Sequence, residues 1–176
     1  MEAAIRQSER NHNGQFQEQL QQRIHAAQAS AASGDLRLGL MLGPRRCLLD
    51  LGEAAEIIND ISITPVPFTQ NWCIGLANWR GDLISVIDLA CFCGLALPGQ
   101  YTQSCGIVLP KSLIGNCAFR VSHLLGLHDL RQMRLQAQHD HTPPFGRLYL
   151  DRNMAQWAEI SFAAIVADAR FLHMVL

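Results

Sequence analysis

Charged residues interrupt an apolar run in the segment "NWRGDLISVIDL", residues 78–89. Arg80, Gly81 and Asp82 separate two stretches rich in Trp, Ile, Leu and Val, and Asp88 ends the second stretch. In one interpretation Arg80 and Asp88 cap a hairpin and a turn in solvent, where an exposed ion pair contributes about 0–1 kcal/mol. In the other, one of these charges belongs to a desolvated pair, whose disruption costs about 3–5 kcal/mol. The residues alone leave both interpretations open.

Cysteine and histidine spacing raises the question of a metal site. Cys91 and Cys93 could supply two zinc ligands, and His139 and His141 could supply the other two. Structural zinc sites usually separate paired cysteines by two or more residues, and the two histidines lie in a proline-rich segment. The spacing therefore disfavours zinc. A metal- or thiol-dependent enzyme that uses these four residues is kept as the alternative function.

The remaining signals point away from catalysis and from nucleic acid. The chain has no phosphate-binding glycine loop, no Gly-x-Ser-x-Gly motif and no paired-histidine helix motif. The formal net charge is −1 and there is no run of Lys or Arg, so the electrostatic footprint of a nucleic-acid-binding protein is missing. All six cysteines lie among apolar residues, which favours buried, reduced thiols. We predict no catalytic residues, no metal and no cofactor.

Short strands dominate the pattern along the chain. Leucines alternate from residue 36 to residue 42, and a predicted turn at 43–45 joins this strand to the next one in a hairpin. Gly81 permits the positive φ of a second hairpin tip at 80–82. Residues 121–127 are interpreted as a short amphipathic element, and residues 131–146 as a loop because they are polar and contain paired prolines. The predicted strands are 36–42, 46–51, 72–79, 83–89, 105–109, 116–121 and 147–150, which indicates a mainly β protein.

Helices are expected at both ends of the chain. Near the N-terminus, apolar residues recur at helical spacing from Phe16 to Ala31 among Gln and Glu. This helix either packs loosely on the domain or binds a partner; self-association through it would predict that deletion of residues 1–34 abolishes oligomers. At the other end, Ser161 is placed to cap an amphipathic helix over residues 161–176, whose apolar face is predicted to hold Ile165, Val166, Ala169, Leu172, His173 and Leu176. The sequence shows neither a signal-peptide core nor an apolar stretch of about 20 residues, so we expect a cytoplasmic protein without membrane insertion.

Residues 63–95, "ITPVPFTQNWCIGLANWRGDLISVIDLACFCGL", resemble the signature of the CheW family of chemotaxis coupling proteins. That signature has Val-Pro, then Gly-x-x-Asn-x-Arg-Gly with apolar x, then a strand ending in Val/Ile-Asp-Leu, then a short helix closing on Gly-Leu. The resemblance extends from about Leu36 to the end of the chain, and residues 157–175 resemble the ending of the type IV pilus subgroup. The matching positions are Pro65, Val66, Pro67, Gly75, Asn78, Arg80, Gly81, Ile87, Asp88, Leu89, Gly94 and Leu95.

This resemblance implies both a fold and a function. The fold would be two five-stranded, SH3-like β-barrels with an N-terminal and a C-terminal helix, divided into an extension over 1–34 and a CheW-like domain over 35–176. The function would be non-catalytic coupling of methyl-accepting chemotaxis receptors to a CheA-like histidine kinase, in control of twitching motility. One barrel would bind the regulatory domain of the kinase, and a groove between the barrels would take the receptor tip. The protein would be recruited from the cytoplasm to membrane receptor arrays.

The resemblance also assigns roles to residues. Glu56 and Arg80 match the family's paired acid and arginine near the receptor-binding surface, and Asp88 matches the aspartate that closes the strand. In this hypothesis Gly81 turns the hairpin, Arg80 reaches back to Glu56, and Asp88 fixes the next turn. The predicted partner-binding residues are Glu56, Gly75, Asn78, Trp79, Arg80, Gly81 and Asp88.

Three positions depart from the family pattern. Ser85 stands where the family usually has Pro, Trp79 where it has a smaller aliphatic residue, and Ala54 where a larger apolar residue is common. These differences concern the receptor contact rather than the fold. An exposed Trp79 would be a natural anchor for a partner.

Overall fold

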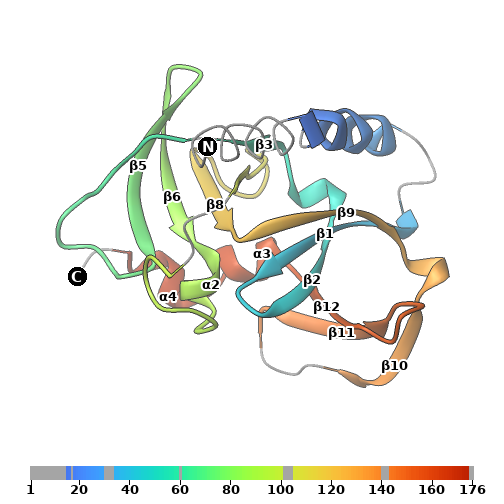
Figure 1. Cartoon of the computed structure of the whole chain (residues 1–176). Coiled ribbons are helices and arrows are strands. Elements are labelled where there is room, and N and C mark those ends of the chain that lie inside the picture. The colour runs from blue at the N-terminus through green and yellow to red at the C-terminus, as the bar shows by residue number, and fades with distance from the viewer. Residues whose placement is uncertain are drawn as a thin grey trace, which may run out of the picture.

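Two six-stranded β-sheets lie side by side in the computed structural model (Figure 1). The structure describes residues 15, 16, 18–29, 34–59, 61–100, 105–139 and 143–174, except for the side chains of 138 and 139. The mainly β class is confirmed, with an N-terminal helix beside the sheets and short helices near the C-terminus. Among the described residues each sheet has six strands, whereas the resemblance implies five in each barrel, and strand β4 of the second sheet has only two residues.

The first sheet has the strand order β10-β11-β12-β2-β1-β9. Its β1–β2 hairpin is the one predicted from the leucine alternation: Leu38, Leu40 and Leu42 are fully buried, and Leu42 pairs with Arg45 across the turn. Strands β12 and β2 run parallel, which brings the C-terminal part of the chain beside the N-terminal hairpin. The strands are β1 Leu36–Leu42, β2 Arg45–Asp50, β9 His123–Asp129, β10 Arg134–His139, β11 Phe145–Leu150 and β12 Gln156–Ile160.

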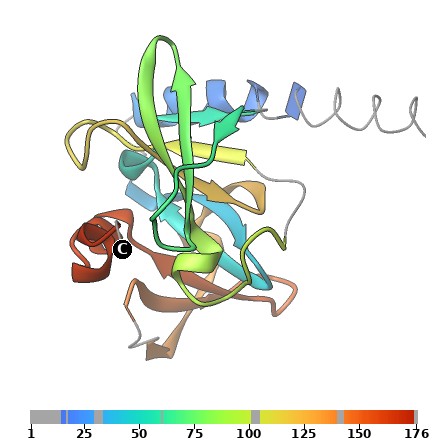
Figure 2. The same ribbon diagram turned by 90° about the vertical axis from the view of Figure 1, so that its left-hand side faces the viewer.

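The second sheet has the strand order β3-β7-β8-β6-β5-β4. Its β5–β6 hairpin projects beyond the rest of the sheet (Figures 1 and 2). Strand β6 then runs parallel to β8, so the hairpin is joined to the second half of the chain. The strands are β3 Glu56–Ile58, β4 Ile63–Thr64, β5 Cys73–Trp79, β6 Asp82–Asp88, β7 Cys105–Val108 and β8 Cys117–Val121.

An aromatic cluster joins the second sheet to the C-terminal helices. Phe119 of β8 packs edge-to-face on Phe162 and Phe171, with ring centroids 4.8 and 5.8 Å away. Phe171 also stacks on Trp72, which meets Phe92 edge-to-face. Such pairs add about 0.5–1.5 kcal/mol each beyond the burial of their area. The helices involved are α2 Leu89–Phe92, α3 Phe162–Val166 and α4 Ala169–Leu172.

Two sequence interpretations in the second half of the chain are wrong. Residues 121–127, taken as a short amphipathic element, belong largely to β9, which pairs with β1 along its length. The segment 131–146, taken as a loop, contains the end of the 3-10 turn Leu130–Gln132, strand β10 and the start of β11. Strand β10 is an edge strand with mostly exposed side chains, so it lacks the apolar alternation that marks a half-buried strand.

The C-terminal helical segment is present, but as two short helices rather than one. Ser161 caps α3 as predicted, because its hydroxyl accepts from the Ala164 amide. Asp168 is extended and its carboxylate accepts from the Arg170 amide, so it ends the first helical segment and caps α4. As a result Leu172, predicted on the apolar face, is 71% exposed, whereas Phe171 is buried; Leu176 lies outside the described residues.

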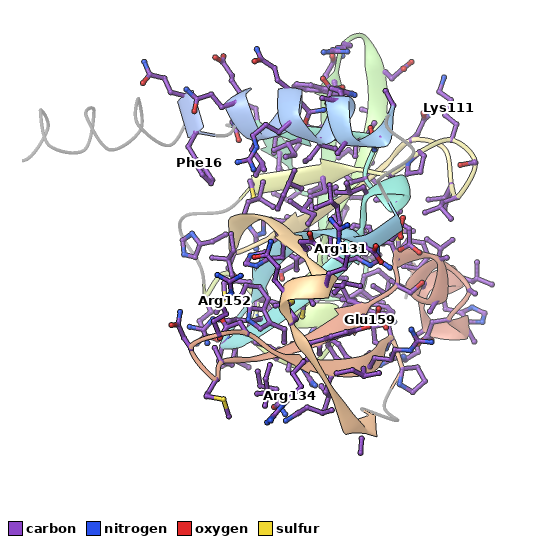
Figure 3. All side chains as sticks on the ribbon, turned by 90° about the vertical axis from the view of Figure 1, so that its right-hand side faces the viewer. Phe16, Lys111, Arg131, Arg134, Arg152 and Glu159 are labelled. Carbon is purple, nitrogen blue, oxygen red and sulfur yellow. The ribbon has the colours of Figure 1, made fainter. Side chains whose placement is uncertain are left out.

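The N-terminal helix is helical over residues 18–28 and packs into the main core. Leu20 and Ile24 are 2% and 1% exposed, so the packing is close rather than loose. Phe16 lies nearer the start of the helix and is 44% exposed (Figure 3). Ala31, which was included in the apolar stripe, lies outside the described residues. The division of the chain at residue 34 stays a prediction.

His128 packs against Trp157 on the face of the first sheet opposite to the buried leucines of β1. The His128 ring lies 4.3 Å from that of Trp157, and a Cβ on Gly39 would come within 2.6 Å of the His128 ring. Glycine at this position of β1 therefore makes room for the imidazole. The Nε2 atom of His128 is buried without a hydrogen-bond partner among the described residues. Burial lowers the pKa of His128, with a smaller opposing effect from the Asp151 carboxylate.

We expect His128 to make the protein less stable in mild acid. Below about pH 6.5 the unfolded chain protonates this histidine, whereas the folded protein resists protonation, so the free energy of unfolding falls as the pH drops through that value. Thermal melts from about pH 8 to about pH 5 should show a steeper loss of Tm in the wild type than in His128→Gln. Equal slopes for the two proteins would contradict this assignment.

Candidate functional site

The tip of the β5–β6 hairpin is a tight two-residue turn. Trp79 pairs with Asp82, so Arg80 and Gly81 alone form the loop, and Asp82 belongs to β6 rather than to the predicted three-residue link. Both loop residues have positive φ, 52° at Arg80 and 89° at Gly81, which matches the twist of a hairpin. The Gly81 amide donates to Oδ1 of Asn78 at 3.2 Å. Asn78 and Gly81 therefore shape the turn that presents Arg80.

Glu56, Trp79 and Arg80 form one cluster, which we call the Glu56 triad. Arg80 Nη2 donates to Glu56 Oε1 at 2.5 Å, and Trp79 Nε1 donates to Glu56 Oε2 at 3.2 Å. The Arg80 guanidinium also lies 5.4 Å from the centre of the Trp79 ring, within cation–π range. The contact between Glu56 and Arg80 that the resemblance implied is present, and Trp79, at a position that departs from the family pattern, takes part in it.

The triad is exposed enough to be available to a partner. The Arg80 side chain is 71% exposed and that of Glu56 is 23% exposed. An ion pair of this kind contributes about 0–1 kcal/mol to folding, so the fold does not require it. Leu83 lies opposite Asn78 on the same hairpin and is 60% exposed. The guanidinium and the indole at the hairpin tip thus meet a carboxylate supplied by β3. Leu83 adds an exposed leucine on the face of the hairpin opposite to Trp79.

Gly75 lies further along β5, away from the turn, and has a packing role. Its φ is 140°, and an added Cβ would lie 2.2 Å from the backbone oxygen of Thr64. Strand β4 pairs with β5 at this point, since Thr64 is opposite Leu76. Glycine is therefore needed for the close approach of β4 to β5, and the role of Gly75 in partner binding stays a prediction.

Asp88 lies at the opposite end of β6 and is buried, with 4% of its surface exposed. Its Oδ1 accepts from the Cys91 amide and caps α2, as the sequence hypothesis expected. Its Oδ2 forms an ion pair with Arg120, the residue opposite it on the parallel strand β8. Arg80 and Asp88 are thus not partners: one belongs to an exposed pair and the other to a buried pair. A role of Asp88 in binding a partner stays a prediction.

Sequence reasoning missed Arg120 and Leu83. Arg120 interrupts the apolar strand "CAFRV" much as Arg80 and Asp88 interrupt theirs, and this was the signal available. Nothing local could have paired it with Asp88, which lies 32 residues away. Leu83 gave no signal, because a leucine in an apolar strand normally indicates burial.

The residues of the alternative enzyme hypothesis are not assembled into a described site. Burial raises the pKa of Cys93 to about 12 and also raises the pKa of Cys91, which favours the protonated thiol over a reactive thiolate. Within the part of the chain that the structure describes, no three His, Cys, Asp or Glu side chains are grouped as metal ligands. The side chain of His139, and His141 entirely, lie outside the described residues.

A cavity of about 420 Å³ lies between β2, β11, β12 and the start of α3, and none of its lining residues belongs to the β5–β6 hairpin. Its carboxylates already have partners. Glu53 accepts from the Phe162 amide and the Ser161 hydroxyl, Asp50 lies 3.4 Å from Arg37, and Glu159 accepts from a tyrosine hydroxyl at 3.3 Å. The contacts of Glu53 hold the 3-10 turn Leu51–Glu53, which follows β2, to the start of α3, whereas the other two contacts lie within the first sheet.

The chain belongs to the CheW family. The sequence model of the CheW-like domain matches residues 37–157, which include all of β1 except its first residue, the Glu56 triad and the Asp88–Arg120 pair. This confirms the family that the resemblance indicated.

Two characterised relatives match shorter segments. Protein PilI of Pseudomonas aeruginosa is 32% identical over 71 residues, which make up 40% of this chain and 40% of that protein. Chemotaxis protein CheW of Thermotoga maritima is 28% identical over 86 residues, or 49% of this chain and 56% of that protein. The matched segments thus span about half the length of these relatives.

The fold is shared with a solved structure. Scaffolding protein TtCheW of Thermoanaerobacter tengcongensis superposes with a TM-score of 0.59 at 21% sequence identity, and the match covers 72% of this chain and 88% of that one. The predicted CheW-like fold is therefore confirmed. None of the helices in the described residues has the length and apolar character needed to cross a bilayer.

We expect Gly75→Ala to destabilise the protein by about 1–3 kcal/mol, because the new methyl group would collide with the backbone of β4 at a strained φ. Urea unfolding measures the change. Gly115→Ala is the matched control, since a Cβ at Gly115 would meet nothing within 4 Å. Equal stability of the two variants would show that β4 does not pack on β5 as described.

Removal of the Asp88 carboxylate should cost about 3–5 kcal/mol, because Arg120 is only 18% exposed and would keep an unpaired charge. Urea unfolding of Asp88→Ala, Arg120→Ala and the double variant tests this coupling. The double variant should be more stable than the sum of the two single effects predicts. Strict additivity would mean that the two side chains do not act as a pair.

Proposed function

We propose that this protein is a non-catalytic adaptor that couples methyl-accepting chemotaxis receptors to the regulatory domain of a CheA-like histidine kinase. Membership of the CheW family supports the proposal, as do the words "chemotaxis" and "scaffolding" in the names of two similar proteins. In this proposal the Glu56 triad is part of the receptor-binding surface, and the protein acts at membrane receptor arrays.

The observation that carries this proposal is the exposed Glu56 triad, in which the tip of the β5–β6 hairpin meets Glu56 of β3. Figure 2 shows how far this hairpin projects. Three polar or aromatic groups are held in one geometry there although their ion pair adds little to the stability of the fold. Arg and Trp are also the residue types that most often dominate binding energy in protein interfaces. Leu83 adds exposed apolar area on the other face of the same hairpin.

We further propose that the output is twitching motility driven by type IV pili. Similarity to Protein PilI supports this, together with the resemblance of residues 157–175 to the ending of the pilus subgroup. The buried positions in that segment include Trp157, Phe162 and Phe171, which tie it to the core of the protein.

The first test is calorimetric titration of the protein with two targets, the regulatory domain of the kinase and receptor-tip fragments from the same organism. We expect Arg80→Ala to weaken receptor binding by about tenfold or more, since it removes an exposed Arg that both the carboxylate and the indole contact. Its Tm should stay close to that of the wild type, because the ion pair of Arg80 is exposed.

Arg131→Ala is the charge-matched control for this experiment. Arg131 is 66% exposed and pairs with Asp129 at 2.7 Å, but it belongs to the 3-10 turn Leu130–Gln132, between two strands of the other sheet (Figure 3). The Arg131→Ala variant should leave receptor binding unchanged. Absence of binding by the wild type to every kinase and receptor fragment would overturn the adaptor proposal. A large drop in the Tm of Arg80→Ala would make Arg80 a structural residue instead.

A further inference from the structure

The N-terminal helix closes the free edge of β3. Among the described strands, β3 has a single neighbour, β7, so its other edge would present unpaired backbone groups. The outward-facing amide of Ile57 instead donates to Oε1 of Gln21 at 2.7 Å. Nε2 of Gln21 lies 2.7 Å from Nε2 of His25, one turn further along the helix, which orients the amide with its oxygen towards Ile57.

The same helix also holds the segment that leads into β3. Nε2 of Gln28 donates to the backbone oxygens of Leu51 and Ala54, at 2.6 and 3.0 Å. Ile24 and Ala27, which lie between Gln21 and Gln28 in the sequence, are buried in the main core. Gln21 and Gln28 thus join one face of the helix to β3 and to the segment before it. Gln22, the residue after Gln21, is exposed.

Strand β3 carries the acid at the centre of the Glu56 triad. Glu56 directly precedes Ile57, and its carboxylate receives Arg80 on one oxygen and Trp79 on the other. Adjacent residues share a peptide plane, so the bond at the Ile57 amide fixes the backbone from which Glu56 projects. The family match begins at residue 37, so the helix that supplies this bond lies outside the matched segment.

We infer that Gln21 is a positioning residue for the Glu56 triad, and that the docked N-terminal helix sets the affinity of the partner-binding surface. The inference rests on the proposed function. In this inference the apolar stripe of the helix packs into the protein's own core. The helix supports the binding surface by holding β3 in place, without contacting a partner itself.

The test compares three variants of the full chain with the wild type. Gln21→Leu removes the acceptor and keeps the size of the side chain, Gln21→Glu keeps an acceptor, and Gln22→Leu is the matched control on the exposed face. Gln21→Ala is the second loss variant if Gln21→Leu folds poorly. Two NMR signals need no partner: hydrogen exchange of the Ile57 amide, and the position of the Trp79 indole N–H resonance.

We expect the Ile57 amide to exchange about tenfold faster in Gln21→Leu, with a shifted Trp79 indole resonance and about three- to tenfold weaker receptor binding. Gln21→Glu should restore all three readouts, and Gln22→Leu should leave them unchanged. Faster exchange without a change at Trp79 or in affinity would overturn the inference, because Gln21 would then be purely structural. Unchanged exchange would overturn it as well.

The binding measurements and the NMR signals together distinguish a failure of this inference from a failure of the proposed function. If the wild type binds no kinase or receptor fragment, the adaptor proposal fails, whereas the NMR signals still report whether Gln21 positions Glu56. If the wild type binds and Gln21→Leu binds equally well, the adaptor proposal stands and the positioning role fails.

Discussion

The buried ion pair between Asp88 and Arg120 is the interaction on which the architecture of the second sheet depends. Two charges withdrawn from water are tolerated only when each has a partner, and here each meets the other across the parallel strands β6 and β8. The same carboxylate caps α2, while the Asp88 amide donates to the Trp72 backbone oxygen at 2.7 Å. One side chain therefore ties together a strand pair, a helix start and the base of the hairpin.

The consequence is a hairpin whose two ends have different physical roles. At its base a buried pair and an aromatic cluster around Trp72 hold the strands in place. At its tip the backbone turns through two residues with positive φ and exposes Arg80 beside Trp79 and Glu56. Because the exposed pair adds little to stability, the residues at the tip are free to be selected for binding a partner.

Both ends of the chain complete this arrangement. The C-terminal segment supplies Phe162 and Phe171 to the aromatic core, and Glu53 accepts from the start of α3 to hold it there. The N-terminal helix closes the edge of β3 through Gln21. The CheW-like fold is thus stabilised by elements that precede and follow the β1–β2 and β5–β6 hairpins, and the edge strand that carries Glu56 is held from both sides.

The sequence by itself determined the features that depend on neighbouring residues. Leucine alternation placed the β1–β2 hairpin, Gly81 placed the tip of the β5–β6 hairpin, and Ser161 placed the start of α3, because periodicity and capping are local properties. The Glu56–Arg80 contact came from the family resemblance rather than from spacing. Only the tertiary structure decided that Asp88 pairs with Arg120, that 131–146 holds a strand, and that Gln21 completes β3. These choices depend on which distant segments pack together, and a polar edge strand or a distant partner leaves no periodic signal in its own residues.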